Sequence, residues 1–235
     1  MENIENLVKN YRPDPRAIDL ISKLKIVFLV GISGAGKDTI VNQLLKSGDF
    51  HRIVTHTTRQ PRYDNGRMEA DGIDRYFIDN KKAIEMLENH EFIEAKFVHG
   101  TTLYGTSVDE FEYAASLGKT PIANIDVQGV EEYMKMSGNV IPIFVVPPSY
   151  NVWVSRLRGR YDSEGEFQST WRSRKESAIN EIDFALKSDY YKFIVNDSLD
   201  VAVSDARKII DGNFDEPYQA KSIEIAKEIL NQLTK

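Results

Sequence analysis

The chain has 235 residues, and 36 acidic against 30 basic side chains give it a formal net charge of -6 at pH 7. Its length suits one large α/β domain with insertions. The negative balance argues against nucleic acid or an anionic membrane as the main partner. The absence of cysteine excludes a disulfide framework and a thiolate metal site. With no signal-peptide pattern and no long apolar run, we expect a cytoplasmic protein.

The first 24 residues contain one helix signal. Asp14 followed by Pro15 is typical of a helix N-cap with proline at the first helical position. Ile18 and Ile21 then recur at helical spacing. We therefore expect residues 1–24 to form a helical extension that packs on the sheet, with contact to a second subunit as the alternative.

The stretch from Lys25 to Thr39 predicts a strand, a glycine-rich turn and a helix. Five apolar residues after Lys25 are typical of a buried parallel strand, and apolar residues resume at helical spacing after Thr39. Between them, Gly31, Gly36 and Lys37 fit the spacing G-x-x-x-x-G-K. This is the P-loop pattern, in which backbone N–H groups and the lysine bind nucleotide phosphates.

A second phosphate-binding pattern follows the P-loop helix. Ile53 and Val54 predict a short strand that leads into it. Arg59 and Arg62 lie three residues apart beside threonine hydroxyls, and guanidinium forks match the oxygens of a phosphate monoester. Taken alone, the segment is equally consistent with solvent-exposed surface charge.

These two patterns and six further segments resemble the guanylate kinase family between residues 25 and 210. The matching segments follow the order of the family: 31–39, 55–62, 69–77, 92–94, 104–107, 124–129, 156–160 and 194–197.

The resemblance implies an α/β fold with a P-loop NTPase-type three-layer core around a parallel sheet. The core is expected at 25–54 and 108–210, with a lid at about 159–173 and a small nucleoside-monophosphate-binding insert at 55–107. Apolar, β-rich runs at 121–125, 140–146 and 192–195 agree with a parallel sheet. Beyond the resemblance, residues 211–235 form a C-terminal extension whose last part has an amphipathic helical pattern, docked on the core or on a partner.

On the acceptor side, the resemblance assigns the phosphate of GMP to Arg59, Arg62 and Tyr104, and the guanine to Thr55, Glu94, Thr106 and Asp126. Guanine presents two adjacent donors that one carboxylate can accept, whereas adenine presents an acceptor there. A second phosphate-binding tyrosine of the family falls on Arg75, which can also hold phosphate. The loop at 63–69 is longer than usual, so the family's loop glutamate is either Glu69 or missing.

On the donor side, the resemblance assigns ATP to Ser33, Gly34, Ala35, Gly36, Lys37, Asp38, Thr39 and Asn196. The catalytic residues it implies are Lys37, Arg156, Arg160 and Arg174, which would neutralise the transferred phosphoryl group and exclude water. Arg156 and Arg160 are four residues apart and share a face if that segment is helical. Counting back from Glu181 favours Arg174 over Arg172.

Two positions near the expected magnesium ion depart from the family together. Asp38 stands where the family has a serine hydroxyl, and Asn124 stands where it has an aspartate. We therefore expect Asp38 to take over the orientation of hydrated magnesium, with Asn124 acting through water. Two unrelated substitutions are the alternative.

The resemblance thus implies an enzyme, an ATP:GMP phosphotransferase that moves the γ-phosphoryl group of ATP to GMP or dGMP with Mg²⁺ as cofactor. The expected partners are ATP and GMP, without nucleic acid or membrane, and the expected state is a monomer or a homodimer. A kinase of another small phosphate acceptor stays open because Arg75 and Asn124 are unusual. The other alternative, a non-catalytic interaction module, is disfavoured by the intact Gly36 and Lys37.

Overall fold

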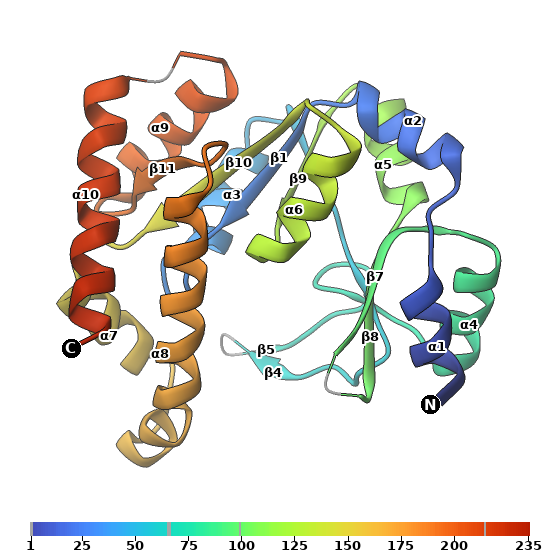
Figure 1. The fold of residues 1–235 in the computed structure, drawn as a ribbon, viewed down its shortest axis with the longest axis horizontal. Helices are drawn as coiled ribbons and strands as arrows, with labels where there is room; N and C mark the ends of the chain where they lie inside the picture. Colours follow the sequence, from blue (N-terminus) through green and yellow to red (C-terminus); the bar gives the residue numbers. More distant parts are fainter. Residues whose placement is uncertain (1, 65–66, 99, 214) are drawn as a thin grey trace. The chain divides into compact units, whose positions relative to one another are not determined.

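The computed structural model describes residues 2–64, 67–98, 100–213 and 215–235. The chain divides into two compact units (Figure 1). The first comprises Met1–Leu24, Phe50–Pro121 and Lys135–Asn139, and the second comprises Lys25–Asp49, Ile122–Met134 and Val140–Lys235. Among the described helices, none is both long and apolar enough to cross a lipid bilayer.

The first unit is built on a sheet with the strand order β6-β3-β8-β7. The longest pair is antiparallel and places Glu94 opposite Thr106 and Lys96 opposite Tyr104, with a register shift between Phe92 and Glu94. The strands in the first unit, in chain order, are β2 (Phe50–Arg52), β3 (His56–Thr57), β4 (Tyr63–Asp64), β5 (Arg67–Met68), β6 (Tyr76–Phe77), β7 (Phe92–Val98) and β8 (Thr102–Ser107).

The helices of the first unit include those of the N-terminal extension. They are α1 (Glu2–Asn10), α2 (Pro15–Lys23), α4 (Asn80–Glu88) and α5 (Val108–Ser116). Ile4 of α1 packs with Met86 of α4 and Phe92 of β7 in one buried apolar cluster. The predicted start of α2 is confirmed, because the Asp14 side chain accepts the backbone N–H of Arg16 at 2.8 Å.

The second unit contains a parallel sheet, as predicted. Within it the strands follow the order β11-β10-β1-β9, and every described pair is parallel. The bounds are β1 (Ile26–Val30), β9 (Thr120–Asn124), β10 (Val140–Val146) and β11 (Lys192–Val195). All of β1 is buried, as expected for a strand covered on both faces.

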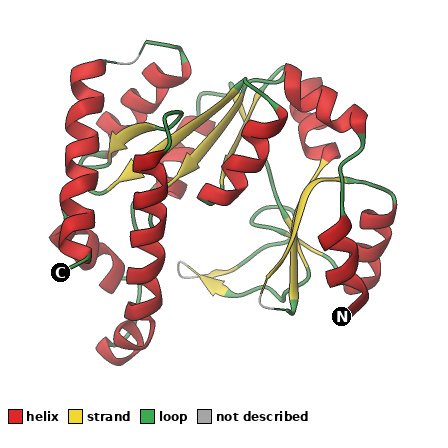
Figure 2. Ribbon diagram, in the orientation of Figure 1, coloured by secondary structure: helices red, strands yellow, loops and turns green. Residues whose placement is uncertain are grey.

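Helices surround this sheet (Figure 2). They are α3 (Lys37–Leu45), α6 (Val127–Met136), α7 (Tyr150–Arg158), α8 (Glu164–Lys187), α9 (Leu199–Ile210) and α10 (Glu216–Leu233). Helix α10, which begins six residues before the predicted amphipathic stretch at Ser222, packs beside α8 (Figure 1). The boundary between the units divides β9 after Pro121, near its start, and α6 after Met134, near its end.

Two local predictions were wrong. The strand expected at Ile53 and Val54 ends at Arg52 instead, because the N–H of Val54 bonds to the carboxylate of Glu110 at 2.9 Å. Helix α7 ends at Arg158, so Arg160 lies outside it and does not share a helical face with Arg156.

Candidate functional site: a P-loop hollow and an arginine cluster

The P-loop in the second unit connects β1 to α3. Gly31 and Gly36 have φ values of 129° and 92°, a backbone region in which side chains are strained. A Cβ added at Gly31 would clash with the backbone carbonyl oxygen of Val145, and one at Gly36 would clash with Nδ2 of Asn196. Glycine is therefore required at both positions by conformation and by space.

Side chains from distant segments hold the loop in place. Asn196 donates Nδ2 to the carbonyl oxygen of Ala35 at 2.8 Å, and Trp153 donates Nε1 to that of Ser33 at 2.7 Å. Arg156 in turn donates to the carbonyl oxygen of Asn196 at 2.9 Å. These bonds fix the carbonyl groups of Ser33 and Ala35, and the N–H of Ala35 is itself bonded to the carbonyl oxygen of Ile32 at 3.1 Å. A backbone held in this way suits the binding of phosphate oxygens by the remaining amides of the loop.

Lys37 lies at the base of an open hollow of about 290 Å³ in the second unit. Its ammonium group donates to the carbonyl oxygens of Gly31 and Ile32. Burial lowers the pKa of Lys37, while Glu181 and Asp38 act against that shift. Residues that line the hollow also include Asn124, Asp126 and Arg160.

Half-buried Glu181 brings a second charged group to the hollow. Burial raises the pKa of its carboxyl group, while a hydrogen bond from Ser177 at 2.7 Å and the charge of Lys37 lower it. The positive charge of Lys37 would pair with the negative charge of a phosphate that enters the hollow. Arg174 of α8 also acts electrostatically on Glu181, which places it near this group.

Asp38 and Asn124 are direct neighbours at the edge of the hollow. Asn124 donates Nδ2 to Oδ1 of Asp38 at 2.6 Å, and its own Oδ1 is buried without a hydrogen-bond partner among the described residues. Nearby, Asp126 accepts the N–H of Gly129 at 2.6 Å at the start of α6. The Oδ1 atom of Asn124 is suited to accept a hydrogen bond from a magnesium-bound water, since magnesium keeps several waters and prefers oxygen ligands.

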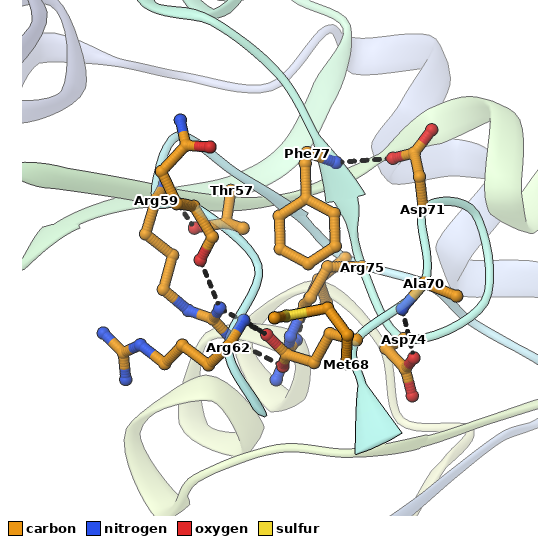
Figure 3. Close-up of polar contacts among 12 residues, drawn as sticks. Thr57, Arg59, Arg62, Met68, Ala70, Asp71, Asp74, Arg75 and Phe77 are labelled. Atoms are coloured by element: carbon orange, nitrogen blue, oxygen red, sulfur yellow. Dashed lines mark hydrogen bonds and ion pairs between the residues drawn. The ribbon is translucent and has the colours of Figure 1, made fainter. Parts of the chain in front are cut away.

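Residues of the first unit that are predicted to hold the acceptor phosphate form an arginine cluster around one carboxylate (Figure 3). Arg59 pairs with Glu69 through two bonds, Nη1–Oε2 at 2.5 Å and Nη2–Oε1 at 2.7 Å, and donates Nε to the hydroxyl of Tyr104 at 3.2 Å. The N–H of Arg62 also bonds to Glu69, at 2.9 Å. These contacts hold the pKa of Glu69 below its usual value, with the Arg59 hydrogen bond as the main cause.

The remaining residues of this unit that are predicted to bind the acceptor lie on neighbouring strands and loops. Glu94 of β7 accepts the hydroxyl of Thr106 of β8 at 2.8 Å. Arg75 donates to the hydroxyl of Thr55. The pairing of Glu94 with Thr106 leaves a carboxylate and a hydroxyl side by side, an arrangement that can accept the paired donors of a purine edge.

Sequence reasoning left three residues of these sites unassigned. Glu69, whose place in the family was ambiguous, is the central carboxylate of the arginine cluster. Trp153 supports the P-loop, and Glu110 accepts both the N–H of Val54 and the hydroxyl of Tyr76, at 2.9 Å each. The unusual length of the loop at 63–69 obscured Glu69, and the residues around Trp153 and Glu110 form no pattern that indicates their distant partners. Asn65 and Gly66 of that loop lie outside the described residues.

Comparisons with known proteins agree with these observations. The family model described as guanylate kinase matches residues 23–213. Guanylate kinase 1 of Arabidopsis thaliana is 38% identical over 179 residues, which cover 75% of this chain and 44% of the plant protein. Guanylate kinase of Methylobacillus flagellatus is 32% identical over 189 residues, which cover 80% of this chain and 89% of that one.

A solved structure supports the fold independently. The crystal structure of guanylate kinase from Anaplasma phagocytophilum matches with a TM-score of 0.58 and 27% identity, covering 90% of this chain and 94% of that one. The chain spans just under half the length of the two plant relatives, at 44% and 47%. The predicted P-loop α/β fold is confirmed, and the chain belongs to the guanylate kinase family.

Proposed function

We propose that this chain transfers the γ-phosphoryl group of ATP to GMP or dGMP. The observation that supports this most directly is Lys37, which lines the hollow together with Glu181 and Arg160 and interacts electrostatically with both. A non-catalytic relative has no need to keep a desolvated lysine under an ordered phosphate loop. Membership of the guanylate kinase family supplies the reaction class.

The donor nucleotide is proposed to bind in the core at 25–54 and 108–210. The amides of residues 33–39 would hold its phosphates, and Asn196 would contact the adenine as well as the P-loop. Lys37, Arg156, Arg160 and Arg174 would stabilise charge on the transferred group, with residues 159–173 as the lid. No covalent intermediate on the protein is required.

The acceptor nucleotide is proposed to bind in the insert at 55–107. Arg59, Arg62, Arg75 and Tyr104 would hold the phosphate of GMP. Thr55, Glu94, Thr106 and Asp126 would bind guanine. The Arg59–Glu69 pair keeps the guanidinium group oriented before the phosphate arrives, so less side-chain entropy is lost on binding.

Magnesium is proposed as the cofactor, and the residues present fit it. Asp38 would hold waters of the hydrated ion, and so would Oδ1 of Asn124, which accepts no hydrogen bond within the described part of the chain. When bound, the ion neutralises charge on the β- and γ-phosphates.

A panel of nucleoside monophosphates, assayed with ATP and magnesium in a coupled ADP assay, tests the proposal. GMP and dGMP should be phosphorylated and AMP, CMP and UMP should not. Because Arg75 replaces a tyrosine of the family, another phosphorylated acceptor is the second candidate, and its preference over GMP would contradict the proposal. Binding of ATP without turnover of any monophosphate would point to an interaction module instead.

A further inference from the structure

Tyr11, in the N-terminal extension, makes an unusual contact with β7. Its hydroxyl donates to the carbonyl oxygen of Phe92 at 2.6 Å and accepts the N–H of the same residue at 2.9 Å. Strand β7 is at one end of the order β6-β3-β8-β7. The Tyr11 hydroxyl therefore satisfies the backbone N–H and carbonyl groups of Phe92, as a neighbouring strand would. Burial raises the pKa of Tyr11 to about 12, so the hydroxyl stays protonated and able to donate.

Phe92 connects Tyr11 to strand β8, which carries two of the residues proposed to bind the acceptor. Its ring is fully buried and lies so close to Gly105 that a Cβ added there would meet its Cδ1 at 2.8 Å. Gly105 stands between Tyr104 and Thr106 on β8. A displacement of Phe92 would therefore move or release the strand that carries both residues.

The register shift of the β7–β8 pair lies at the same place. Phe92 is opposite Ser107 and Glu94 is opposite Thr106, so Ile93 is the extra residue of an irregularity. Such a bulge redirects the side chains that follow it, and the first of these is Glu94, which bonds to Thr106 at 2.8 Å. Tyr11 fixes the residue on the other side of the bulge.

We propose that Tyr11 is a positioning residue that sets the orientation of Glu94 for guanine recognition. This inference rests on the proposed function, because it assigns guanine to Glu94. Tyr11 lies outside residues 23–213, the part of the chain that the family model matches. The N-terminal extension is thus part of the specificity apparatus of the acceptor unit.

Tyr11→Phe removes the hydroxyl alone and keeps the ring, which packs near His90 and Phe92. GMP and inosine monophosphate differ only in the 2-amino group that Glu94 is expected to read. We expect the GMP-to-IMP ratio of kcat/KM to fall about fivefold, the equivalent of one hydrogen bond. The KM for ATP should not change. Tyr113→Phe, on an exposed tyrosine of the same unit, should leave the ratio as it is.

An unchanged GMP-to-IMP ratio in Tyr11→Phe, or an equal loss for both nucleotides, would overturn the inference. Calorimetric binding of GMP and IMP without ATP separates this from the proposed function. A wild-type chain that binds GMP in preference to IMP without turnover contradicts the proposed function alone. A preference that Tyr11→Phe retains contradicts only the role of Tyr11.

Hydrogen exchange on the wild-type chain gives a measurement that does not depend on the folding of a variant. The Phe92 amide should be protected, and GMP should increase the protection of the peptide that contains Phe92 and Glu94. Rapid exchange of that amide, with no response to GMP, would also overturn the inference.

Discussion

Asn124 donates its side-chain amide to the carboxylate of Asp38 across 2.6 Å, so the two residues near the expected magnesium ion that depart from the family pattern are hydrogen-bonded to each other. An aspartate at position 124 would instead face Asp38 with a second negative charge. The two substitutions are therefore physically linked, whether or not magnesium is bound.

A double-mutant cycle measures this link. Asp38→Ser and Asn124→Asp should each lower magnesium-dependent turnover about tenfold, as changes around a metal typically do. The double variant should recover activity beyond additivity, because it restores one carboxylate and one neutral partner. Asn124→Asp alone should also lower the melting temperature without magnesium and regain it when magnesium is added. Additive losses would show that the two positions changed independently.

Lys37→Ala should abolish phosphoryl transfer while the chain stays folded. Removing a largely desolvated cation that is proposed to face the transferred charge typically costs a factor of about a hundred or more in kcat. The melting temperature should not fall, since the pKa of Lys37 is lowered and burial of its charge disfavours folding. Lys46→Ala, on an exposed lysine after α3, is the matched control. Wild-type turnover in Lys37→Ala would exclude the proposed mechanism.

The Arg59–Glu69 pair predicts a pH dependence of stability. The pKa of Glu69 is lower in the folded chain than its usual value of 4.5, chiefly because of the hydrogen bond from Arg59. As the pH falls, Glu69 therefore takes up its proton earlier in the unfolded chain than in the folded chain. The stabilisation is present above about pH 4.5 and is lost as the pH drops through the folded pKa. Glu69→Gln should be less stable than wild type at pH 7, with the difference shrinking towards about pH 3.

Thermal unfolding across this pH range tests the Glu69 prediction. Glu88→Gln, on an exposed carboxylate of α4, should follow the wild-type curve. A constant difference between Glu69→Gln and wild type over the whole range would mean that the ion pair contributes nothing to acid sensitivity.

Gln219 of α10 predicts a role for the C-terminal extension in stability. Its side chain accepts the N–H of Phe193 at 2.7 Å and donates to the carbonyl oxygen of the same residue at 2.9 Å. Gln219→Leu would leave both backbone groups buried and unpaired, which we expect to cost about 2 kcal/mol in the free energy of unfolding. Denaturant titration measures this, with Gln232→Leu on the exposed face of α10 as control. Equal stability of the two variants would contradict the prediction.

The sequence predicted the elements whose patterns are local and strong. The buried strands β1, β10 and β11 lie where apolar runs placed them, and α2 begins at its Asp14 cap. Positions decided by distant side chains could not be predicted. Val54 has the composition of a strand residue, but its N–H bonds to Glu110, 56 residues further along the chain.

The candidate site shows the same limit. The motifs located the P-loop and predicted that the arginines hold the acceptor phosphate, but they did not show how the hydrogen bonds of either group are distributed. The motif predicted that Asn196 contacts adenine. It did not predict that the side-chain amide of Asn196 donates to the carbonyl oxygen of Ala35, which lies 161 residues earlier in the chain. Glu69 stood in a loop of unusual length, so only its two bonds to Arg59 identified it as part of the cluster.

The contact of Gln219 with Phe193 also bears on how the chain avoids aggregation. Strand β11 ends the order of its sheet, and an uncovered end strand is a template for pairing with another copy. Gln219 occupies the backbone groups of Phe193 that such a copy would use, so a truncated form without α10 would offer them to its neighbours and tend to self-associate through added strands.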